Sequence, residues 1–469
     1  MNAAPRKHSP ASASVPTAPQ SWPEPPAQLA AIRTVPRDPR YAALSSTYMR
    51  RGRPAAVFSA RGDTDVSAVV AYAAEVRRTT GVRVPFSIRS GGHGISGAAT
   101  NSDGIVLDLS ALNRVAVVEA DDGIFRAQAG ATWGAVAHAL APLDRALTSG
   151  NFGGTGVGGL VTAGGIGFFA RSQGLTLDHA RRLRVVTADG SARWVDGIHE
   201  PELFWALRGG AAQGGIVVDA ELHAPHLGSN AGGAAVIHHE VQYLLDDLPL
   251  FVSRWGAWVR ESPRELESFI MLQSTGDGRT VVQARNLWAN DRIDEAQSTL
   301  EDGLNIGRVL EQHATVTPYP RLVPDPGRTN TRPPLEMRSA LIDHADADLG
   351  RAIGDALTHE ATLLVELRAL GGAVNDVDSD ATAWAGRHQE AFVATWAHPL
   401  GVERVRTSFA SVLELATGSY GAYSTDTTAA AANRVWPGST GDRLRNVADR
   451  YDPERLFDQG LVLPRATSD

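Results

Sequence analysis

The hydrophobic residues between positions 53 and 88 change their spacing twice, and they predict a strand, a helix and a second strand. Residues 53–60 form the apolar run of a short strand. Asp63 then caps an amphipathic helix that ends at Gly81. The apolar positions of this helix recur three and four residues apart: Val66, Val69, Val70, Ala73 and Val76. The second strand lies at residues 84–88, and a strand–helix–strand unit predicts a parallel pair.

Shorter elements of both kinds fill the chain up to about residue 224. Strands are predicted at residues 104–109, 124–129, 183–187, 192–195 and 214–222, the third and fourth joined as a hairpin. Helices are predicted at residues 132–140 and 201–210.

From residue 224 to about residue 418, longer strands alternate with longer helices. The predicted strands are 234–241, 267–273, 280–288 and 363–370, and the predicted helices are 244–261, 293–304 and 345–360. A Pro-rich stretch at residues 318–334 predicts a loop. This pattern predicts a second α/β domain with an antiparallel sheet. Beyond it we expect a helix at residues 441–450, followed by the sequence YDPERLF.

Composition narrows the classes of function. The net charge is −8 and Lys7 is the only lysine, so no basic block is available to bind nucleic acid. The chain has no cysteine, which excludes disulfides, Cys-ligated metals and thiol catalysis and fits a reducing compartment. The length of 469 residues, 43% of them hydrophobic, allows more than one domain with a full core.

The first 40 residues are rich in Pro, Ala and Ser and predict a disordered arm. They lack the apolar run of a signal peptide, and no stretch elsewhere reaches the roughly 20 apolar residues of a membrane helix. We therefore expect a soluble, cytoplasmic protein with no membrane partner.

A histidine stands in a glycine turn directly after the predicted strand at residues 84–88. The stretch at residues 85–97 reads PFSIRSGGHGISG, with His93 between Gly92 and Gly94. Glycines remove every Cβ from such a turn, so backbone N–H groups can converge on an anion and the chain can lie close to a flat ligand. The alternative is a surface turn that happens to contain a histidine.

A second glycine-rich stretch lies at residues 149–167, SGNFGGTGVGGLVTAGGIG. It holds nine glycines in nineteen residues, too many for a helix or strand interior. A flexible linker would be polar and of low complexity, whereas this stretch is interleaved with apolar residues such as Phe152 and Val157. We favour an ordered binding loop. It is not a Rossmann fingerprint, and the chain has no GxxxxGK[ST] phosphate loop.

These motifs, with others in the same order, resemble the vanillyl-alcohol-oxidase/PCMH-type flavoproteins and, among them, the berberine-bridge-enzyme-like branch. The matching sequences are RSGGHGISG at 89–97, TGVGGLVTAGGIG at 155–167 with GLTLD at 174–178, LFWALRGG at 203–210, GGIVVDAEL at 214–222, LGGAV at 370–374 with Arg387, YGAY at 420–423, and YDPERLF at 451–457. The resemblance covers nearly everything after residue 50.

The resemblance implies an α+β fold. We expect a two-part PCMH-type FAD-binding domain at residues 41–225 and a substrate-binding domain at 226–418 with an antiparallel sheet flanked by helices. Residues 419–469 would return to the FAD domain, and residues 1–40 would be the disordered arm.

The resemblance also implies an FAD cofactor bonded through His93 to the flavin 8α-methyl group. The residues it assigns to cofactor binding are Arg89, Ser90, Gly91, Gly92, His93, Gly94, Gly97, Gly153, Gly154, Thr155, Gly158, Gly159, Gly164, Gly167, Gly174, Asp178, Gly215, Val217 and Tyr420. Many relatives form a second bond from a cysteine, but Phe152 occupies that place here. We therefore expect a single histidyl linkage, as in bacterial 6-hydroxynicotine oxidases of this fold.

The implied reaction is the oxidation of a small alcohol, amine or secondary-metabolite intermediate by hydride transfer to flavin N5, with O2 as acceptor. Tyr423 resembles the base of some relatives, with Tyr420 beside it. A phenol with a pKa near about 10 needs a cationic neighbour to act as a base near pH 7. The alternative is that both tyrosines only pack on the flavin. Ala422 also replaces the asparagine of the family's Tyr-x-Asn-Tyr motif.

Other residues have two possible roles. Glu366 and Arg368 share one face of a strand and either reach the pocket or form a satisfied pair elsewhere. His238 and His239 point to opposite faces, so no metal site is expected. The pocket-lining or core residues of the second domain include Phe269, Trp288, Tyr319, Trp384 and Trp396.

Three classes of function remain open. The leading one is an oxidase, and the alternative is a flavin dehydrogenase or oxidative cyclase that reacts poorly with O2. Thr155 lies near the position that gates oxygen in relatives, but it does not decide between these two classes. A non-catalytic flavin-binding protein is the third class, and the many destabilising glycines argue against it. The sequence leaves the substrate and the oligomeric state open.

Overall fold

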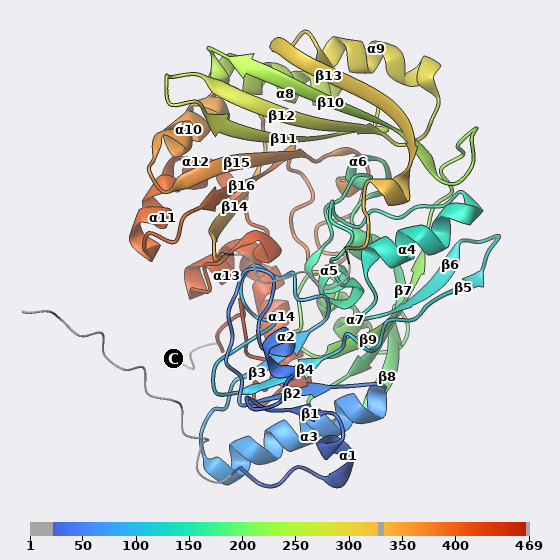
Figure 1. Cartoon of the computed structure of the whole chain (residues 1–469), viewed down its shortest axis with the longest axis vertical. Helices are drawn as coiled ribbons and strands as arrows, with labels where there is room; N and C mark the ends of the chain where they lie inside the picture. The colour runs from blue at the N-terminus through green and yellow to red at the C-terminus, as the bar shows by residue number, and fades with distance from the viewer. Residues whose placement is uncertain (1–21, 327–332, 466–469) are drawn as a thin grey trace, which may run out of the picture.

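Three β-sheets organise the chain in the computed structural model, which describes residues 22–326 and 333–465 (Figure 1). Two smaller sheets lie in the lower half of Figure 1, and one large sheet lies at the top. The large sheet begins after the two small ones are complete, because the last small-sheet strand ends at His223 and the first large-sheet strand starts at Ala235.

The first sheet has four strands in the order β1-β2-β4-β3. The strands are β1 (Arg33–Thr34), β2 (Ala56–Ser59), β3 (Phe86–Arg89) and β4 (Ile105–Asp108). Helix α3 (Asp63–Thr80) joins β2 to β3, and both strands run parallel to β4 between them. The predicted strand–helix–strand unit is confirmed, but its two strands do not form a direct pair, because β4 lies between them. Asp63 is the first residue of the helix, after an N-cap at Gly62, and the second strand begins at Phe86.

The second sheet has five antiparallel strands in the order β5-β6-β9-β7-β8. The strands are β5 (Val115–Glu119), β6 (Ile124–Gln128), β7 (Ala180–Val186), β8 (Ala192–Asp196) and β9 (Ile216–His223). The predicted hairpin is confirmed as β7 and β8. Helices that pack on this sheet are α4 (Trp133–Leu140), α7 (Pro201–Ala206) and α14 (Gly438–Tyr451). Strand β5 was not predicted, because four of its five residues are exposed and do not alternate.

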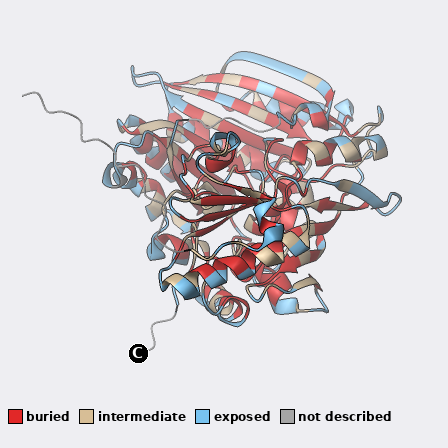
Figure 2. Cartoon of the chain, turned by 60° about the horizontal axis from the view of Figure 1, so that its bottom comes forward, coloured by how far each residue is buried: buried red, intermediate tan, exposed pale blue. Residues whose placement is uncertain are grey.

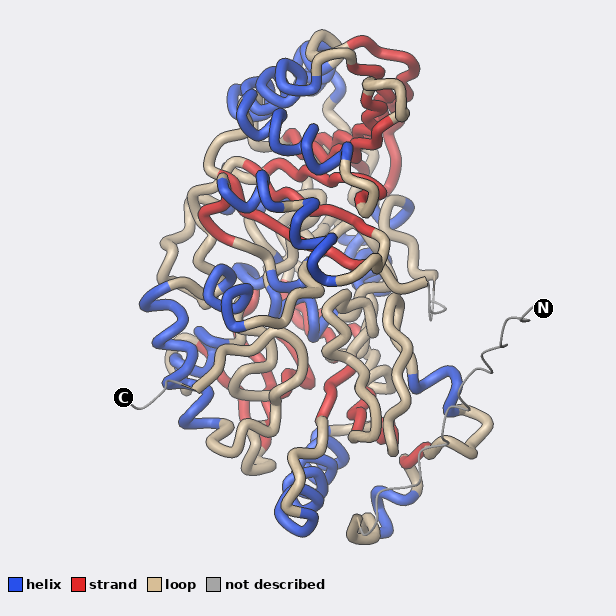
Figure 3. Tube along the Cα trace, turned by 90° about the vertical axis from the view of Figure 1, so that its left-hand side faces the viewer, coloured by secondary structure: helices blue, strands red, loops and turns tan. Residues whose placement is uncertain are grey.

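The third sheet has eight antiparallel strands in the order β13-β10-β12-β11-β15-β16-β14-β17. The strands are β10 (Ala235–Leu245), β11 (Leu266–Ser274), β12 (Thr280–Trp288), β13 (Arg308–Pro318), β14 (Glu336–Ile342), β15 (Thr362–Ala369), β16 (Ala391–Ala397) and β17 (Ala416–Gly418). The helices of this half are α8 (Leu248–Glu261), α9 (Ile293–Gly303), α10 (Ala347–Thr358), α11 (Val402–Ser408) and α12 (Ala410–Glu414). Figure 3 shows helices gathered on one side of this sheet, which leaves the other side facing the smaller sheets.

Two predictions for this half need correction. The helix predicted from residue 244 begins at Leu248, because Leu244 and Leu245 still pair with β12. The loop predicted at residues 318–334 includes a short 3₁₀ turn at Tyr319–Arg321, and its residues 327–332 lie outside the described residues.

The remaining elements are short. They are α1 (Ala27–Ala30), α2 (Tyr41–Ser45), α5 (Val157–Ala163), α6 (Ala170–Gln173), α13 (Ala429–Val435) and the 3₁₀ turns Ala141–Leu143, Thr176–His179, Gly372–Val374 and Gly421–Tyr423. Figure 2 shows buried residues along the strands and exposed residues along the outer faces of the helices.

Both ends of the described chain pack against the first sheet. The arm predicted to be disordered over residues 1–40 is ordered from residue 22, since Leu29 and Ile32 enter the core and Tyr72 OH donates to Pro23 O at 2.8 Å; residues 1–21 lie outside the described residues. At the other end, Asp452 accepts hydrogen bonds from the backbone N–H groups that follow it, at 2.7 and 2.8 Å, and Phe457 is buried in the same core.

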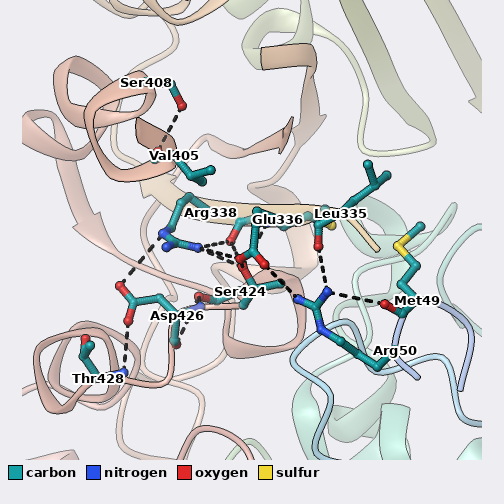
Figure 4. Close-up of polar contacts among 12 residues, drawn as sticks. Met49, Arg50, Leu335, Glu336, Arg338, Val405, Ser408, Ser424, Asp426 and Thr428 are labelled. Atoms are coloured by element: carbon teal, nitrogen blue, oxygen red, sulfur yellow. Dashed lines mark hydrogen bonds and ion pairs between the residues drawn. The ribbon is translucent and has the colours of Figure 1, made fainter. Parts of the chain in front are cut away.

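A polar cluster ties the two halves together at the start of β14 (Figure 4). Arg50, from the loop after α2, donates to Leu335 O at 3.1 Å and pairs with Glu336 at 3.4 Å. Thr425, near the C-terminal segment, donates to Glu336 and accepts from Arg338 Nη1 at 2.8 Å. Two segments that are distant in the sequence are therefore fixed to one strand of the large sheet.

Among residues 22–326 and 333–465, no helix is long and apolar enough to cross a bilayer.

Candidate active site

A cavity of about 540 Å³ lies between the large sheet and the two smaller ones. Its walls come from the turn after β3, the glycine-rich segment around α5, strands β11, β12, β15 and β16, and the C-terminal segment. A volume in this range is typical of small-molecule and cofactor sites. Three of the motifs that the sequence singled out therefore meet at one place: the glycine turn at 89–97, the glycine-rich stretch at 149–167 and the YGAY motif at 420–423.

The glycine turn after β3 lies against the glycine-rich segment with no side chain between them. A Cβ on Gly91 would lie 2.4 Å from the backbone nitrogen of Gly156, so both residues must be glycine for the two loops to cross. Arg89 anchors the end of β3 by pairing with Asp108 at 3.1 Å and donating to Leu44 O. This packing fixes the backbone position from which the side chain of His93 reaches the cavity.

His93 lies between two aromatic rings in the cavity wall. Its ring centroid is 4.8 Å from that of Tyr48 and 4.8 Å from that of Phe152. Burial lowers the pKa of His93 from 6.5 to about 4. The imidazole is therefore neutral at pH 7, which is the form with a nucleophilic ring nitrogen.

The turn also presents backbone donors to the cavity. The N–H groups of Gly91, Gly92 and Gly94 donate to no other residue in the described part of the chain, although Gly92 is buried. A Cβ at Gly94 or at Gly159 would meet no atom within 4 Å, so cavity space begins directly at the backbone there. Unpaired N–H groups and bare backbone fit a cofactor with a pyrophosphate and a flat ring.

The sequence predicted a loop for the glycine-rich segment, but part of the segment is helical. Residues Val157–Ala163 form helix α5. A Cβ on Gly158 would lie 2.7 Å from the Cβ of Ala129, so this glycine lets the helix approach the chain after β6. Close packing therefore outweighs the low helix propensity of glycine.

The predicted cofactor residues divide into two groups. Those that line the cavity are Ser90, Gly91, Gly92, His93, Gly94, Thr155, Gly158, Gly159, Gly215, Val217 and Tyr420. Those that do not line it are Arg89, Gly97, Gly153, Gly154, Gly164, Gly167, Gly174 and Asp178. The structure gives Asp178 a partner elsewhere, since Arg387 donates to both its carboxylate oxygens at 2.7 and 2.9 Å.

A buried ion pair faces the cavity from the large sheet. Arg368 Nε donates to Glu366 Oε1 at 2.6 Å, and Trp396 Nε1 donates to Glu366 Oε2 at 3.1 Å. Both alternatives for this pair are realised together, because the two residues satisfy each other and also line the cavity. Arg368 further donates to the hydroxyl of Tyr423 and to Ile166 O.

The two tyrosines of the C-terminal motif lie beside this pair. The rings of Tyr420 and Tyr423 stack at 5.8 Å, and Gly165 N–H donates to Tyr420 OH at 3.1 Å. Burial raises the pKa of Tyr423 above its ordinary value, although Arg368 acts in the opposite direction. Arg368 stays charged, because Glu366 offsets the effect of burial and raises its pKa.

Of the five aromatic residues singled out in the second domain, Trp396 lines the cavity. Phe269 lies beneath Arg368, whose guanidinium carbon is 4.6 Å from its ring centroid. The other three, Trp288, Tyr319 and Trp384, belong to hydrophobic clusters. Sequence reasoning missed Tyr48 and Arg285, which also line the cavity. Arg285 alternates with buried residues of β12, and this alternation could have indicated that its side chain faces the cavity.

No group of three or more His, Asp or Glu side chains within residues 22–326 and 333–465 could hold a metal ion. His238 and His239 are each buried on β10.

Comparisons with known proteins agree with this geometry. Residues 54–196 match the family model of an FAD binding domain. The (R)-6-hydroxynicotine oxidase of Paenarthrobacter nicotinovorans is 34% identical over 170 residues, which are 36% of either chain. An uncharacterized FAD-linked oxidoreductase of Bacillus subtilis, YgaK, is 26% identical over 80% of this chain and 84% of its own. Relatives of 34–37% identity match over only 27–36% of their own length.

The fold is shared over a longer stretch than the sequence. The glucooligosaccharide oxidase of Acremonium strictum, described with a 6-S-cysteinyl, 8α-N1-histidyl FAD, superposes with a TM-score of 0.79 at 22% identity. The superposition covers 93% of this chain and 98% of that one. The predicted PCMH-type α+β fold is thereby confirmed.

Proposed function

This chain has the fold of the FAD-linked oxidases and an FAD binding domain at residues 54–196, and we propose that it is an FAD-dependent oxidoreductase acting on a small organic molecule. When bound, FAD would accept a hydride from the substrate and pass the electrons on to O2. The observation that carries the proposal is the position of His93, which lines the same cavity as a charged and hydroxyl-bearing cluster, Glu366, Arg368 and Tyr423.

His93 would hold the cofactor through a single covalent bond from a ring nitrogen to the flavin 8α carbon. The lowered pKa keeps the imidazole neutral and able to form this bond at pH 7. The rings of Tyr48 and Phe152 restrict the orientation of the imidazole. A second bond from a cysteine is ruled out by the composition, because the chain contains none.

The glycine turn would bind the pyrophosphate. Its unpaired N–H groups supply donors without a lysine, which agrees with a chain whose only lysine is Lys7. Arg89 supports the turn from behind through Asp108 and does not reach the cavity wall.

Tyr423 would handle the substrate proton. Its hydroxyl oxygen already accepts a hydrogen bond from Arg368. Once the phenol proton has been lost to solvent, a second lone pair of the same oxygen could accept the proton of a substrate O–H or N–H. The raised pKa means that Tyr423 is a phenol at pH 7 and becomes a better proton acceptor as the pH rises. Arg368 then stabilises the phenolate, since the guanidinium remains charged.

The test is an absorbance spectrum of the purified protein before and after acid precipitation. We expect the yellow colour to stay with the protein pellet, and His93→Ala to release it into the supernatant or lose it. His344→Ala, an exposed histidine outside the cavity, is the matched control and keeps the colour in the pellet. Flavin that leaves the wild-type protein on acid treatment would contradict the covalent bond, and a protein without flavin would contradict the whole proposal.

Oxygen uptake during turnover then decides the electron acceptor. An oxidase consumes O2 in step with substrate, whereas a dehydrogenase or cyclase of the same fold turns over with an artificial acceptor and consumes little O2.

A further inference from the structure

The sheet wall of the cavity carries a second arginine with no anionic partner. Arg285 on β12 lies opposite Phe269 of β11, and Phe269 lies opposite Arg368 of β15. Residues opposite one another in neighbouring strands share a face of the sheet, so both arginines project on the cavity side. Both line the cavity.

Two stacked phenyl rings hold the arginines apart at fixed positions. The guanidinium carbon of Arg285 lies 5.0 Å from the ring centroid of Phe168. Phe168 stacks on Phe269 at 5.0 Å, and Arg368 lies over Phe269. A guanidinium on an aromatic face is restrained in position while its N–H edges stay available.

The two arginines differ in whether a carboxylate pairs with the guanidinium. Glu366 neutralises Arg368, and both Glu366 oxygens are engaged. The side chain of Arg285 makes no hydrogen bond and no ion pair with any residue in the described ranges, and its Nε is buried without a partner. Glu240 lies directly opposite Arg285 on β10 but forms no ion pair with it. Burial is the main cause that lowers the pKa of Arg285, and the charge of Glu240 acts in the opposite direction.

The charged side chains of the cavity wall are therefore two arginines and one glutamate. A single unmatched guanidinium favours a ligand with one negative charge. The backbone around Arg285 offers no further donors for a phosphate, because β12 pairs with β10 on one side and β11 on the other.

We propose that Arg285 binds a carboxylate of the substrate, so that this protein acts on a small organic acid. The apolar side chains of Met271, on the neighbouring strand β11, and of Trp396, farther along the same cavity wall on β16, would hold the carbon skeleton. The substrate O–H or N–H that is oxidised then lies toward Tyr423, on the far side of the Phe269–Arg368 stack. This inference rests on the proposed function and names the substrate class of the same site.

The test compares acids with their amides on the purified, flavin-loaded protein. Benzoate and indole-3-acetate are titrated against benzamide and indole-3-acetamide, with the flavin absorbance change and the melting temperature as two readouts of binding. For at least one pair, we expect the acid to bind about ten-fold or more tightly than the amide, the range of one charged hydrogen-bonding contact.

Three variants locate the effect. Arg285→Gln should reduce the acid-to-amide ratio to about one, and Arg285→Lys should retain part of it, because lysine keeps the charge but loses the planar fork. Arg279→Gln is the matched control: it lies in the turn before β12, is exposed and pairs with Asp277. It should leave the ratio unchanged.

The outcomes that contradict the proposal are distinct. Acids that bind no more tightly than their amides in every pair overturn the carboxylate site while leaving the flavin function intact. A flavin content that falls in Arg285→Gln and not in Arg279→Gln assigns the guanidinium to the cofactor instead, which also overturns it. Failure of the proposed function itself appears separately, as a wild-type protein without flavin.

Discussion

Removing the charge of Glu366 should destabilise the protein and also shift its pH dependence. Glu366→Gln keeps the shape of the side chain and an oxygen that can accept from Arg368. It leaves the guanidinium of Arg368 in a site where the two side chains are only 2% and 6% exposed. The remaining partners of Arg368 are the hydroxyl of Tyr423, the carbonyl of Ile166 and three aromatic rings.

The expected loss in the free energy of unfolding is about 3 kcal/mol. Breaking a buried ion pair by removing one partner costs about 3–5 kcal/mol, because the other charge is left uncompensated. The retained hydrogen-bond acceptor and the cation–π contacts place Glu366→Gln at the lower end of that range. Replacing both residues, as Glu366→Gln with Arg368→Met, should restore much of the loss, because no unpaired charge is then buried.

The same variant should move the alkaline part of the rate profile. Burial is the main cause of the raised pKa of Tyr423; Glu366 raises it further and Arg368 lowers it. Without the carboxylate the guanidinium acts alone, so the pKa of Tyr423 falls and the rise in rate begins at lower pH.

Urea unfolding of the four proteins of the double-mutant cycle and the pH dependence of kcat measure the two effects. A loss below about 1 kcal/mol with no coupling between positions 366 and 368 would refute the energetic reasoning. A rate profile that moves to higher pH in Glu366→Gln would refute the electrostatic reasoning.

Two further predictions concern the same site, and a third concerns Glu267, a buried carboxyl on β11 outside the cavity. Gly91→Ala places a Cβ 2.4 Å from the nitrogen of Gly156, so it should lower flavin content and melting temperature together. The added Cβ of Gly159→Ala meets no atom within 4 Å, so this variant should fold normally and weaken flavin binding alone. Measurements of flavin per protein and of Tm separate the two variants. Tyr423→Phe should lower kcat and remove the alkaline rise, with flavin content unchanged; a profile identical to that of the wild type would mean that Tyr423 only packs. Burial raises the pKa of Glu267 to about 8, so the folded protein favours the neutral carboxyl. The wild type therefore loses free energy of unfolding as the pH rises from about 4.5 through 8. Glu267→Gln, measured by urea unfolding, should therefore gain stability relative to the wild type between pH 5 and pH 8, and a constant difference would contradict the assignment.

Local spacing predicted the elements that bury one apolar face or a continuous apolar run. Helix α3 places its apolar positions on one face, and β2 is buried along most of its length, so both follow from sequence alone. Strand β13 could not be predicted in this way, because it is an edge strand with exposed residues at most positions and is specified by pairing with β10. The same holds for the start of α8, where pairing with β12 extends β10.

The cofactor side of the site was more predictable than the substrate side. The glycines around His93 and Gly156 are needed for a close approach of two loops, and such a requirement is visible in the composition of each loop. Arg285 would contribute through its place in a row across three strands and because its side chain forms no ion pair with Glu240, the carboxylate opposite it on β10. Neither property can be read before the register of the sheet is known.

We propose that His93 carries the flavin, and the mass of the peptide that contains this histidine tests the proposal. The purified protein is denatured, digested and analysed by mass spectrometry, with His93→Ala and His344→Ala treated alike. We expect the peptide with His93 to be heavier by one flavin adduct in the wild type and in His344→Ala, with fragment ions that place the adduct on the histidine. A peptide of unmodified mass from a yellow protein, or an adduct on another residue, would contradict it.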